Sequence, residues 1–318
     1  MKLLVTRRMT AEAEARIGAD YDATFRDSEI PLTEPEAAEA LGQYDAIMPT
    51  LGDAFNAACF AQTPSPRAKI LANFGAGFNH IDVEAARAAG VAVTNTPDVV
   101  TDATAELAVT LLLMTARRAG EGERLLRRGA WTGWAPTQLL GMSLSGRRVG
   151  IIGMGRIGKA IAARLHHGFG VKIAYFNRSP VAETGVPAEP YGSLHDLLGA
   201  VDAVILAVPG GAGTRHLIGA AELARLGPDA IIVNIARGDV IDEDALIAAL
   251  QAGQIRAAGL DVYAREPEIP DALRERENAV LLPHLGTAVE ETRTAMALRA
   301  KDNLDAFARG SDLPDRVG

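Results

Sequence analysis

The chain has 318 residues, of which 48% are hydrophobic and 23% charged, which is enough for two globular domains of ordinary size. Its net charge of −8 argues against a nucleic-acid-binding surface. The apolar part of the N-terminus is too short for a signal peptide, and no apolar stretch is long enough to cross a bilayer. The single cysteine, Cys59, fits a reducing compartment and a small buried apolar role. We therefore expect a cytoplasmic protein with no membrane contact.

Strand-like and helical patterns alternate from the start of the chain. Apolar, partly β-branched runs at residues 2–6, 44–50, 68–74 and 91–95 are separated by alanine-rich stretches such as 11–17 and 83–89. This alternation predicts a parallel sheet covered by helices. Residues 101–119 contain no Pro or Gly and are almost continuously apolar, which predicts one long buried helix between domains or subunits.

A glycine motif follows the next apolar run, at residues 149–152. Gly153, Gly155 and Gly158 have the G-x-G-x-x-G spacing, and an amphipathic stretch begins at Arg156. A strand, a tight turn and a helix start are the context in which this spacing predicts dinucleotide binding. The first glycine would allow the turn, the second the approach of the pyrophosphate, and the third close packing of helix on strand. A purely structural glycine turn is the alternative.

The residues after the next strand bear on which dinucleotide is bound. An NAD site usually has an acidic residue about 20 positions beyond the glycines. This chain has Asn177, Arg178 and Ser179 there, and the nearest acid further on is Glu183. A guanidinium can hold a 2′-phosphate that a carboxylate would repel, so the sequence favours NADP(H), with NAD(H) as the weaker alternative. Otherwise Arg178 simply faces solvent.

The alternation resumes in the second half of the chain. Residues 202–209, 230–237, 257–263 and 279–284 are predicted buried strands, each of which ends in a polar or turn residue. Ligands bind beyond the carboxyl ends of such strands. The final predicted helix, 290–308, has no strand after it and could pack on the first domain, which would make that domain discontinuous.

Three side chains at these strand ends have complementary chemistry. Arg237 offers a fork for a carboxylate, and His284 with a nearby Glu266 would make a general acid, because a carboxylate favours imidazolium. Together they would suit the reduction of a 2-oxo acid. The alternatives are a turn histidine, a surface glutamate and an arginine that caps a helix or joins an ion pair. No usual metal-ligand spacing occurs, so we expect no metal.

Several longer motifs resemble the D-isomer-specific 2-hydroxyacid dehydrogenase family, and they follow the family's order. They are residues 95–118, 149–162, 234–246, 257–267 and 281–288. The sequence TPDVVTDATAEL, residues 96–107, is most similar to the glyoxylate/hydroxypyruvate reductase branch. The resemblance implies an α/β fold of two doubly wound parallel-sheet domains. A Rossmann-type cofactor domain, 99–286, would be inserted in a flavodoxin-like substrate domain, 1–98 plus 287–318, with the active site between them.

The same resemblance implies roles for individual residues. Arg237, Glu266 and His284 match the family's catalytic residues, and Asp261 matches a residue near the nicotinamide, although a turn-forming acid is its alternative. Residues 73–82 resemble the substrate-carboxylate loop, so the N–H groups of Ala76 and Gly77 would complement Arg237, and Leu51 would line the substrate side. The positions matching cofactor contacts are Thr101, Gly153, Gly155, Arg156, Ile157, Gly158, Asn177, Arg178, Ser179, Pro209, Thr214, Ile235, Ala236, Asp261, His284 and Gly286.

The resemblance implies an NADPH-preferring reductase of small 2-oxo acids, glyoxylate and hydroxypyruvate first, to 2-hydroxy acids of D configuration. A reductase with a broader or bulkier substrate range is one alternative. A non-enzymatic, nicotinamide-sensing corepressor of the same fold is another. A phosphite dehydrogenase is disfavoured because no Lys lies between Asn73 and Asp82. The family also implies a homodimer, in which Trp131 and Trp134 would be dimer anchors or simply packed side chains.

Overall fold

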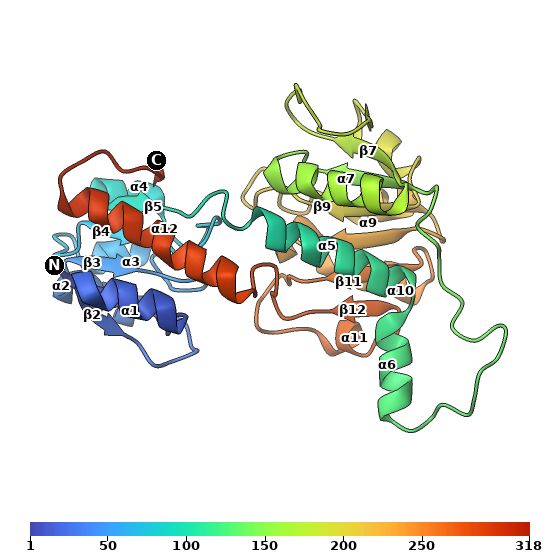
Figure 1. Cartoon of the computed structure of the whole chain (residues 1–318), viewed down its shortest axis with the longest axis horizontal. Helices are drawn as coiled ribbons and strands as arrows, with labels where there is room; N and C mark the ends of the chain where they lie inside the picture. Colours follow the sequence, from blue (N-terminus) through green and yellow to red (C-terminus); the bar gives the residue numbers. More distant parts are fainter. The chain divides into compact units, whose positions relative to one another are not determined.

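The computed structural model describes all residues from 1 to 318 as two compact units, one of which is inserted in the other (Figure 1). Unit 1 contains residues 1–100 and 287–318, and unit 2 contains residues 101–286. The expected boundaries, 98/99 and 286/287, lie within two residues of these. None of the helices combines the length and the apolar composition needed to cross a membrane.

Unit 1 is built around a six-stranded sheet in the order β13-β5-β4-β3-β1-β2. All of its strand pairs are parallel except the edge pair β13–β5. The five parallel strands thus have the flavodoxin-like order. The elements of unit 1 are β1 (Lys2–Val5), α1 (Ala11–Asp20), β2 (Asp22–Phe25), α2 (Glu34–Gln43), β3 (Ala46–Met48), α3 (Ala57–Gln62), β4 (Ile70–Ala72), α4 (Val83–Ala88), β5 (Ala92–Thr94), α12 (Glu290–Ala308) and β13 (Arg316–Val317).

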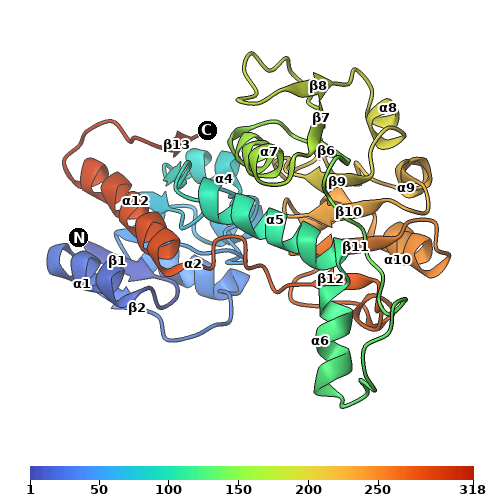
Figure 2. The same ribbon diagram turned by 45° about the vertical axis from the view of Figure 1, so that its right-hand side comes forward.

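The last helix returns to unit 1, as expected. α12 packs against α1 and β4, and the two views of the chain show it running alongside α1 (Figures 1 and 2). A buried carboxylate, Asp315, then receives hydrogen bonds from Arg299 and Asn303 and fixes the turn into β13. The C-terminal residues therefore complete the sheet that begins the chain.

Unit 2 is built around a seven-stranded, fully parallel sheet in the order β12-β11-β10-β9-β6-β7-β8. This is the Rossmann order. The chain adds β7 and β8 on one side of β6 and β9 to β12 on the other, so the topological switch point lies between β6 and β9. The elements of unit 2 are α5 (Thr101–Ala116), α6 (Ala119–Arg127), β6 (Arg148–Ile152), α7 (Arg156–Phe169), β7 (Lys172–Phe176), β8 (Ala188–Pro190), α8 (Leu194–Leu198), β9 (Ala203–Leu206), α9 (Ala220–Leu226), β10 (Ile231–Asn234), the 3₁₀ turn η1 (Gly238–Val240), α10 (Glu243–Gln251), β11 (Ala257–Leu260), α11 (Asp271–Arg274) and β12 (Ala279–Leu281).

The fold class predicted from the sequence is confirmed, but the long helix differs from the prediction. It ends at Ala116 and resumes as α6 after Arg118, whose φ is +53°. The cause is a competing hydrogen bond: the Ala116 carbonyl accepts the N–H of Met142 at 2.7 Å from the returning loop. α5 itself is largely buried within unit 2, where it packs on α7, β10 and β11.

Candidate active site

The carboxyl ends of the strands in unit 2 share one edge of the sheet, since the strands are parallel. The glycine motif follows β6, residues 177–179 follow β7, Pro209 and Thr214 follow β9, and Arg237 follows β10. Glu266 and His284 follow β11 and β12. The fold thus places these residues beyond a single edge of the sheet.

The three motif glycines have different surroundings. Gly153 has a φ of +98°, and a Cβ there would lie 2.6 Å from Ala207 O. A Cβ at Gly158 would lie 2.2 Å from Gly153 O, so helix α7 packs on the turn through a bare backbone. Gly155 has no protein atom within 4 Å of a Cβ position. The protein's own packing thus requires the first and third glycines, whereas the second leaves open space.

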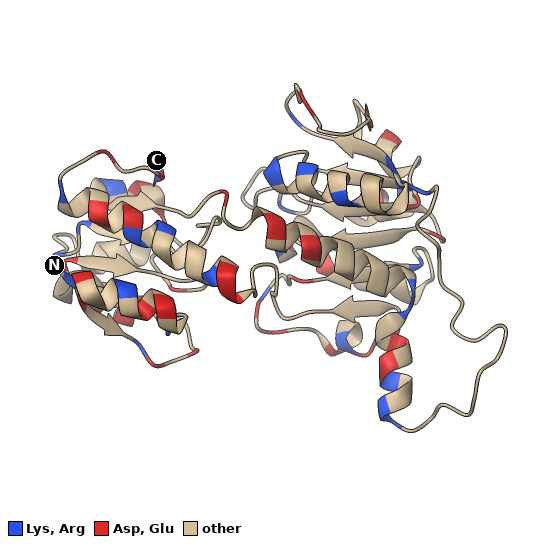
Figure 3. Cartoon of the chain, in the orientation of Figure 1, with Lys and Arg blue, Asp and Glu red and all other residues tan.

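That space adjoins the start of helix α7. The first hydrogen bond of the helix runs from Lys159 N to Gly155 O at 2.9 Å, so the amides of Arg156, Ile157 and Gly158 precede the helical ladder. Such amides and the positive end of the helix dipole favour phosphate. The charged side chains of α7 are all basic (Figure 3). The arrangement fits a dinucleotide pyrophosphate.

The residues beyond β7 divide into a structural and an open part. The side-chain amide of Asn177 accepts from Met154 N at 3.1 Å and donates to Ser179 O at 2.7 Å. It thereby ties the glycine turn to the end of β7. Arg178 and Ser179 are exposed, and Arg178 makes no ion pair or hydrogen bond within the protein.

The loop after β9 lies beside Arg178. One terminal nitrogen of its guanidinium is 3.8 Å from the position that a Cβ on Gly213 would take. The Thr214 hydroxyl donates to Pro209 O at 2.8 Å and so closes this loop on itself. Arg178 is therefore a cation without an ion-pair partner, at the same sheet edge as the glycine motif.

The turn that carries Arg237 is held by Asn234. The Asn234 amide donates to Arg237 O at 2.9 Å, and its oxygen accepts from Ala236 N at 3.0 Å. Ile235 and Ala236 are nearly fully buried, and a Cβ at Gly238 would lie only 1.8 Å from the Tyr263 carbonyl carbon. The turn after β10 thus packs directly on the segment that leads to Glu266.

Arg237 itself makes one hydrogen bond within the protein, from Nη1 to Ala236 O at 2.7 Å. Burial lowers the pKa of its guanidinium, and the negative charges of Glu266 and Asp239 oppose that effect. The guanidinium stays protonated because arginine starts from a very high pKa. Most of its fork is therefore available to an anion.

Glu266 and His284 form a close pair. His284 Nδ1 lies 2.7 Å from Glu266 Oε2, and each side chain is 29% exposed. Burial raises the pKa of Glu266, but the hydrogen bond and charge of His284, the Tyr263 amide and the charge of Arg237 outweigh it and lower the pKa overall. Glu266 is thus held as a carboxylate, and His284 Nε2 is left without a partner inside the protein.

Two residues fix the turn that carries His284. Both carboxylate oxygens of Asp261 accept main-chain N–H groups, from Leu285 at 2.7 Å and from Gly286 at 2.9 Å. Burial raises the pKa of Asp261, and these two amides and the charge of His284 oppose that effect. Tyr263 donates its hydroxyl to Leu282 O at 2.9 Å. Asp261 therefore serves as a turn-forming acid in this structure, and its expected nicotinamide contact stays a prediction.

Asn234 and Tyr263 were not singled out from the sequence. Both lie inside the motifs that carry the family resemblance, which was the only available signal. Their partners are main-chain atoms of neighbouring turns, and such contacts leave no spacing pattern. The remaining expected cofactor position, Thr101, is the half-buried first residue of α5.

The expected substrate residues of unit 1 also leave neighbouring strands. Leu51 follows β3 and is 43% exposed, and Ala76 and Gly77 follow β4. A backbone hydrogen bond from Phe74 N to Pro49 O, 2.9 Å long, joins the two segments. The buried Asp53 carboxylate fixes the Leu51 turn by accepting from Thr50 N at 2.8 Å and from Thr6 Oγ1 at 2.6 Å.

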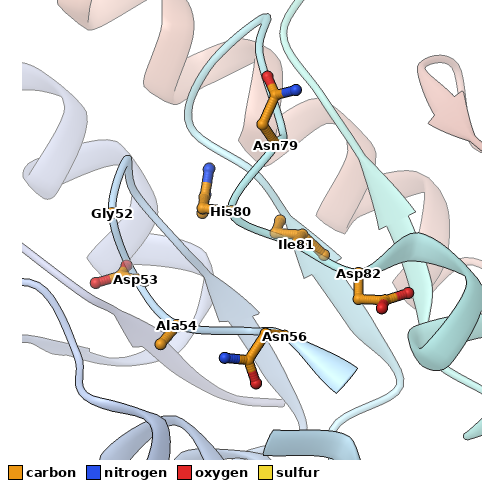
Figure 4. A pocket seen from close by; sticks show the side chains of 8 residues that line it. All are labelled: Gly52, Asp53, Ala54, Asn56, Asn79, His80, Ile81 and Asp82. Carbon is orange, nitrogen blue, oxygen red and sulfur yellow. The ribbon is translucent and has the colours of Figure 1, made fainter. Parts of the chain in front are cut away.

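A pocket of about 380 Å³ in unit 1 is bounded by these segments (Figure 4). Figure 4 shows the side chains following Gly52 on one wall and those following Asn79 on the other. The walls are joined where Asp82 N donates to Phe55 O at 2.8 Å. The lining residues are Gly52, Asp53, Ala54, Asn56, Asn79, His80, Ile81 and Asp82.

Comparison with known proteins gives consistent matches over the whole chain. The model of the D-isomer specific 2-hydroxyacid dehydrogenase, NAD binding domain, matches residues 109–286. A glyoxylate reductase of Thermococcus onnurineus is 39% identical over 99% of this chain and 95% of its own length. A glycerate dehydrogenase of Hyphomicrobium methylovorum is 38% identical over 98% of this chain and 97% of its own.

A solved structure is similar over the same extent. The NADPH-dependent glyoxylate/hydroxypyruvate reductase of Sinorhizobium meliloti, crystallised with NADP and malonate, has a TM-score of 0.86 and 36% sequence identity. The match covers 100% of this chain and 96% of that one. The similarity therefore includes both units.

Proposed function

The chain belongs to the D-isomer specific 2-hydroxyacid dehydrogenase family, and we propose that it is an NADPH-preferring reductase of small 2-oxo acids, with glyoxylate and hydroxypyruvate as first substrates. The observation that carries this proposal is the His284–Glu266 pair at 2.7 Å on the same sheet edge as Arg237. The glyoxylate reductase and the glyoxylate/hydroxypyruvate reductase described above act on such acids by name.

The roles of the side chains follow from their chemistry. Arg237 binds the substrate carboxylate, and the N–H groups of Ala76 and Gly77 are its second anchor, with Leu51 on the substrate side. A nicotinamide cofactor, when bound, would supply the hydride that the carbonyl carbon accepts. His284, whose Nδ1 contacts the Glu266 carboxylate, donates its Nε2 proton to the carbonyl oxygen as negative charge develops there. One hydride and one proton thus convert the 2-oxo acid into a 2-hydroxy acid of D configuration.

The residues present fit a dinucleotide. The open space at Gly155, the amides that precede the hydrogen-bond ladder of α7 and the basic side chains of that helix would hold the pyrophosphate. The other cofactor positions are proposed to be Thr101, Pro209, Thr214, Ile235, Ala236, Asp261 and Gly286, with Asn177 and Ser179 near the ribose.

The preference for NADPH rests on Arg178. Its guanidinium has no protein partner, and residues 177–182 include no carboxylate. An exposed cation of this kind pairs with a 2′-phosphate and gains nothing from a 2′-hydroxyl. The similarity to an enzyme that its name describes as NADPH-dependent supports the same choice.

The test is the initial rate of nicotinamide oxidation with NADPH and with NADH, using glyoxylate, hydroxypyruvate, pyruvate and phenylpyruvate. We expect faster oxidation of NADPH with the two small acids, and D-glycerate as the product from hydroxypyruvate. Arg178→Ala should raise the KM for NADPH about tenfold or more and leave that for NADH unchanged. A preference for NADH, or equal effects on both cofactors, would refute the role of Arg178.

The same measurement separates this proposal from its alternatives. Faster turnover of phenylpyruvate would indicate a bulkier substrate range. If no 2-oxo acid oxidises either cofactor, the reductase proposal is wrong, and a nicotinamide-sensing binding protein takes its place.

We also propose a homodimer. The segment 129–146 has no Asp, Glu, Lys or Arg, and it extends from unit 2 beyond α6 (Figures 1 and 3). Trp131 is 50% exposed, Trp134 81% and Leu140 60%. Large apolar side chains gathered on one uncharged segment are typical of a protein interface.

A further inference from the structure

The loop after β4 has three successive carbonyl groups that are held by side-chain amides. Asn73 Nδ2 donates to Gly75 O at 2.9 Å and to Gly77 O at 3.1 Å. Asn95 Nδ2 donates to Ala76 O at 2.8 Å. The oxygens of residues 75, 76 and 77 are thus all bound from within unit 1.

This arrangement determines where the loop's N–H groups point. In a planar trans peptide, the carbonyl of one residue and the N–H of the next point in opposite directions. The N–H groups of Ala76, Gly77 and Phe78 are therefore each turned away from the amide that holds the preceding carbonyl. None of the three has a hydrogen-bond acceptor in the protein. Successive N–H groups of this kind attract an anion.

The backbone at Gly75 makes this conformation possible. Its φ is +159°, and a Cβ there would lie 3.3 Å from Gly77 O and 3.4 Å from Asn73 Nδ2. A side chain at this position would therefore press on the contacts of Asn73. Gly75 and the buried Asn73 thus together hold the loop in this conformation.

The two amides come from adjacent strands and are themselves firmly placed. Asn73, at the end of β4, is fully buried, and its backbone N–H donates to Thr94 O at 3.0 Å. Asn95, which directly follows β5, is half-buried, and the next residue donates from Thr96 N to Gly75 O at 3.0 Å. The end of the sheet therefore sets the position of both side chains.

We propose that Asn73 and Asn95 are positioning residues for the substrate carboxylate. By holding the three carbonyl groups, they keep the N–H groups of Ala76, Gly77 and Phe78 directed at the anion. This inference rests on the proposed function, and it adds Phe78 N to the two expected amides. Only a side chain with an N–H donor serves here, because a carboxylate would repel the carbonyl oxygens.

The test compares Asn95→Ala and Asn73→Ala with a matched control in the NADPH-loaded full chain. Asn278→Ala is the control, because its Nδ2 also donates to two main-chain carbonyls, those of Leu250 and Arg256, in unit 2. The readouts are kcat and KM for glyoxylate, and the Kd of oxamate, an unreactive analogue that carries the same carboxylate, by calorimetry.

We expect Asn95→Ala to raise the KM for glyoxylate and the Kd of oxamate about tenfold, with a much smaller change in kcat. Asn73→Ala should do the same, and Asn278→Ala should change neither constant. A merely structural role would lower the melting temperature without this split. If Asn73→Ala does not fold, the half-buried Asn95 decides the question.

The inference is overturned if oxamate binding and KM in the Asn95 variant equal those of the control variant. If the unsubstituted protein reduces no 2-oxo acid, the proposed function fails, and the oxamate affinities alone judge the roles of the two asparagines. If the unsubstituted protein also binds no oxamate, both proposals are wrong.

Discussion

Gly155 and Gly158 stand three residues apart, yet the structure gives them different reasons to be glycine. The space beside Gly155 is empty, and its φ of −78° suits any residue. The space beside Gly158 is filled by the carbonyl of Gly153. We expect Gly155→Ala to keep the stability of the protein and to weaken NADPH binding at least about tenfold, or ~1.4 kcal/mol. Gly158→Ala should destabilise the fold by about 1–3 kcal/mol.

Thermal unfolding without cofactor and fluorescence titration with NADPH distinguish the two effects. If Gly155→Ala unfolds early, or binds NADPH as tightly as the unsubstituted chain, the open space is not the pyrophosphate site.

At the residue scale, the sequence indicated side-chain chemistry more readily than contacts. Residue type, position at a strand end and the family resemblance together select Arg237, Glu266 and His284, whose catalytic roles stay predictions. The cofactor contact of Asn177 also stays a prediction, but the sequence did not indicate that its amide joins Met154 N to Ser179 O. Asn73 was only the first residue of a loop motif. Both amides bind main-chain atoms, and such partners become visible only when the turns are placed in space.

The pair of Glu266 and His284 joins the two loops that follow β11 and β12. The pKa of Glu266 lies below its ordinary value of 4.5, because burial is outweighed by His284 and Arg237. Glu266→Gln removes the negative charge that lies 2.7 Å from His284 Nδ1. We expect kcat for the reduction of glyoxylate to fall at least about tenfold in this variant, because the proposed proton donor loses its charged partner.

The contribution of Glu266 to stability should also depend on pH. A depressed carboxyl pKa stabilises the folded state above the unfolded pKa, and this contribution disappears as the pH falls through the folded value. The stability difference between the unsubstituted chain and Glu266→Gln should thus be constant near neutrality and shrink below about pH 4.5. Denaturant melts across that range check this sign, and kcat at neutral pH checks the effect on catalysis. An unchanged kcat would contradict the proposed role of Glu266.

At the element scale, the apolar strands could be predicted, including the edge strand β12, and the edge strands with polar residues could not. β9 and β10 are buried at every position, and their continuous apolar runs identify them. β2, β8 and β13 lie at sheet edges and expose polar residues, so they carry no such pattern. The end of α5 was also missed, because Met142, far along the chain, binds its last carbonyl.

At the scale of the whole molecule, the uncharged segment 129–146 is the proposed contact with a second copy of the chain. Trp134, at 81% exposure, is its most exposed large side chain. If it is buried in a dimer, Trp134→Ser should raise the dimer dissociation constant at least about a hundredfold. Sedimentation velocity over a dilution series measures this constant.

The matched control is Ile30→Ser, which removes an apolar side chain that is 70% exposed on unit 1. This variant should dimerise like the unsubstituted chain. A monomeric unsubstituted chain, or equal behaviour of the two variants, would contradict the dimer proposal.

The central claim is that His284 donates the proton in an NADPH-dependent reduction of a 2-oxo acid. The most direct measurement is the turnover of NADPH with saturating glyoxylate by the unsubstituted chain and by His284→Ala, with the Kd of NADPH measured for both. We predict measurable turnover in the first, a loss of about 10²–10⁴-fold in the second, and an unchanged Kd. Equal turnover in the two proteins, or none in the unsubstituted chain, would contradict the account.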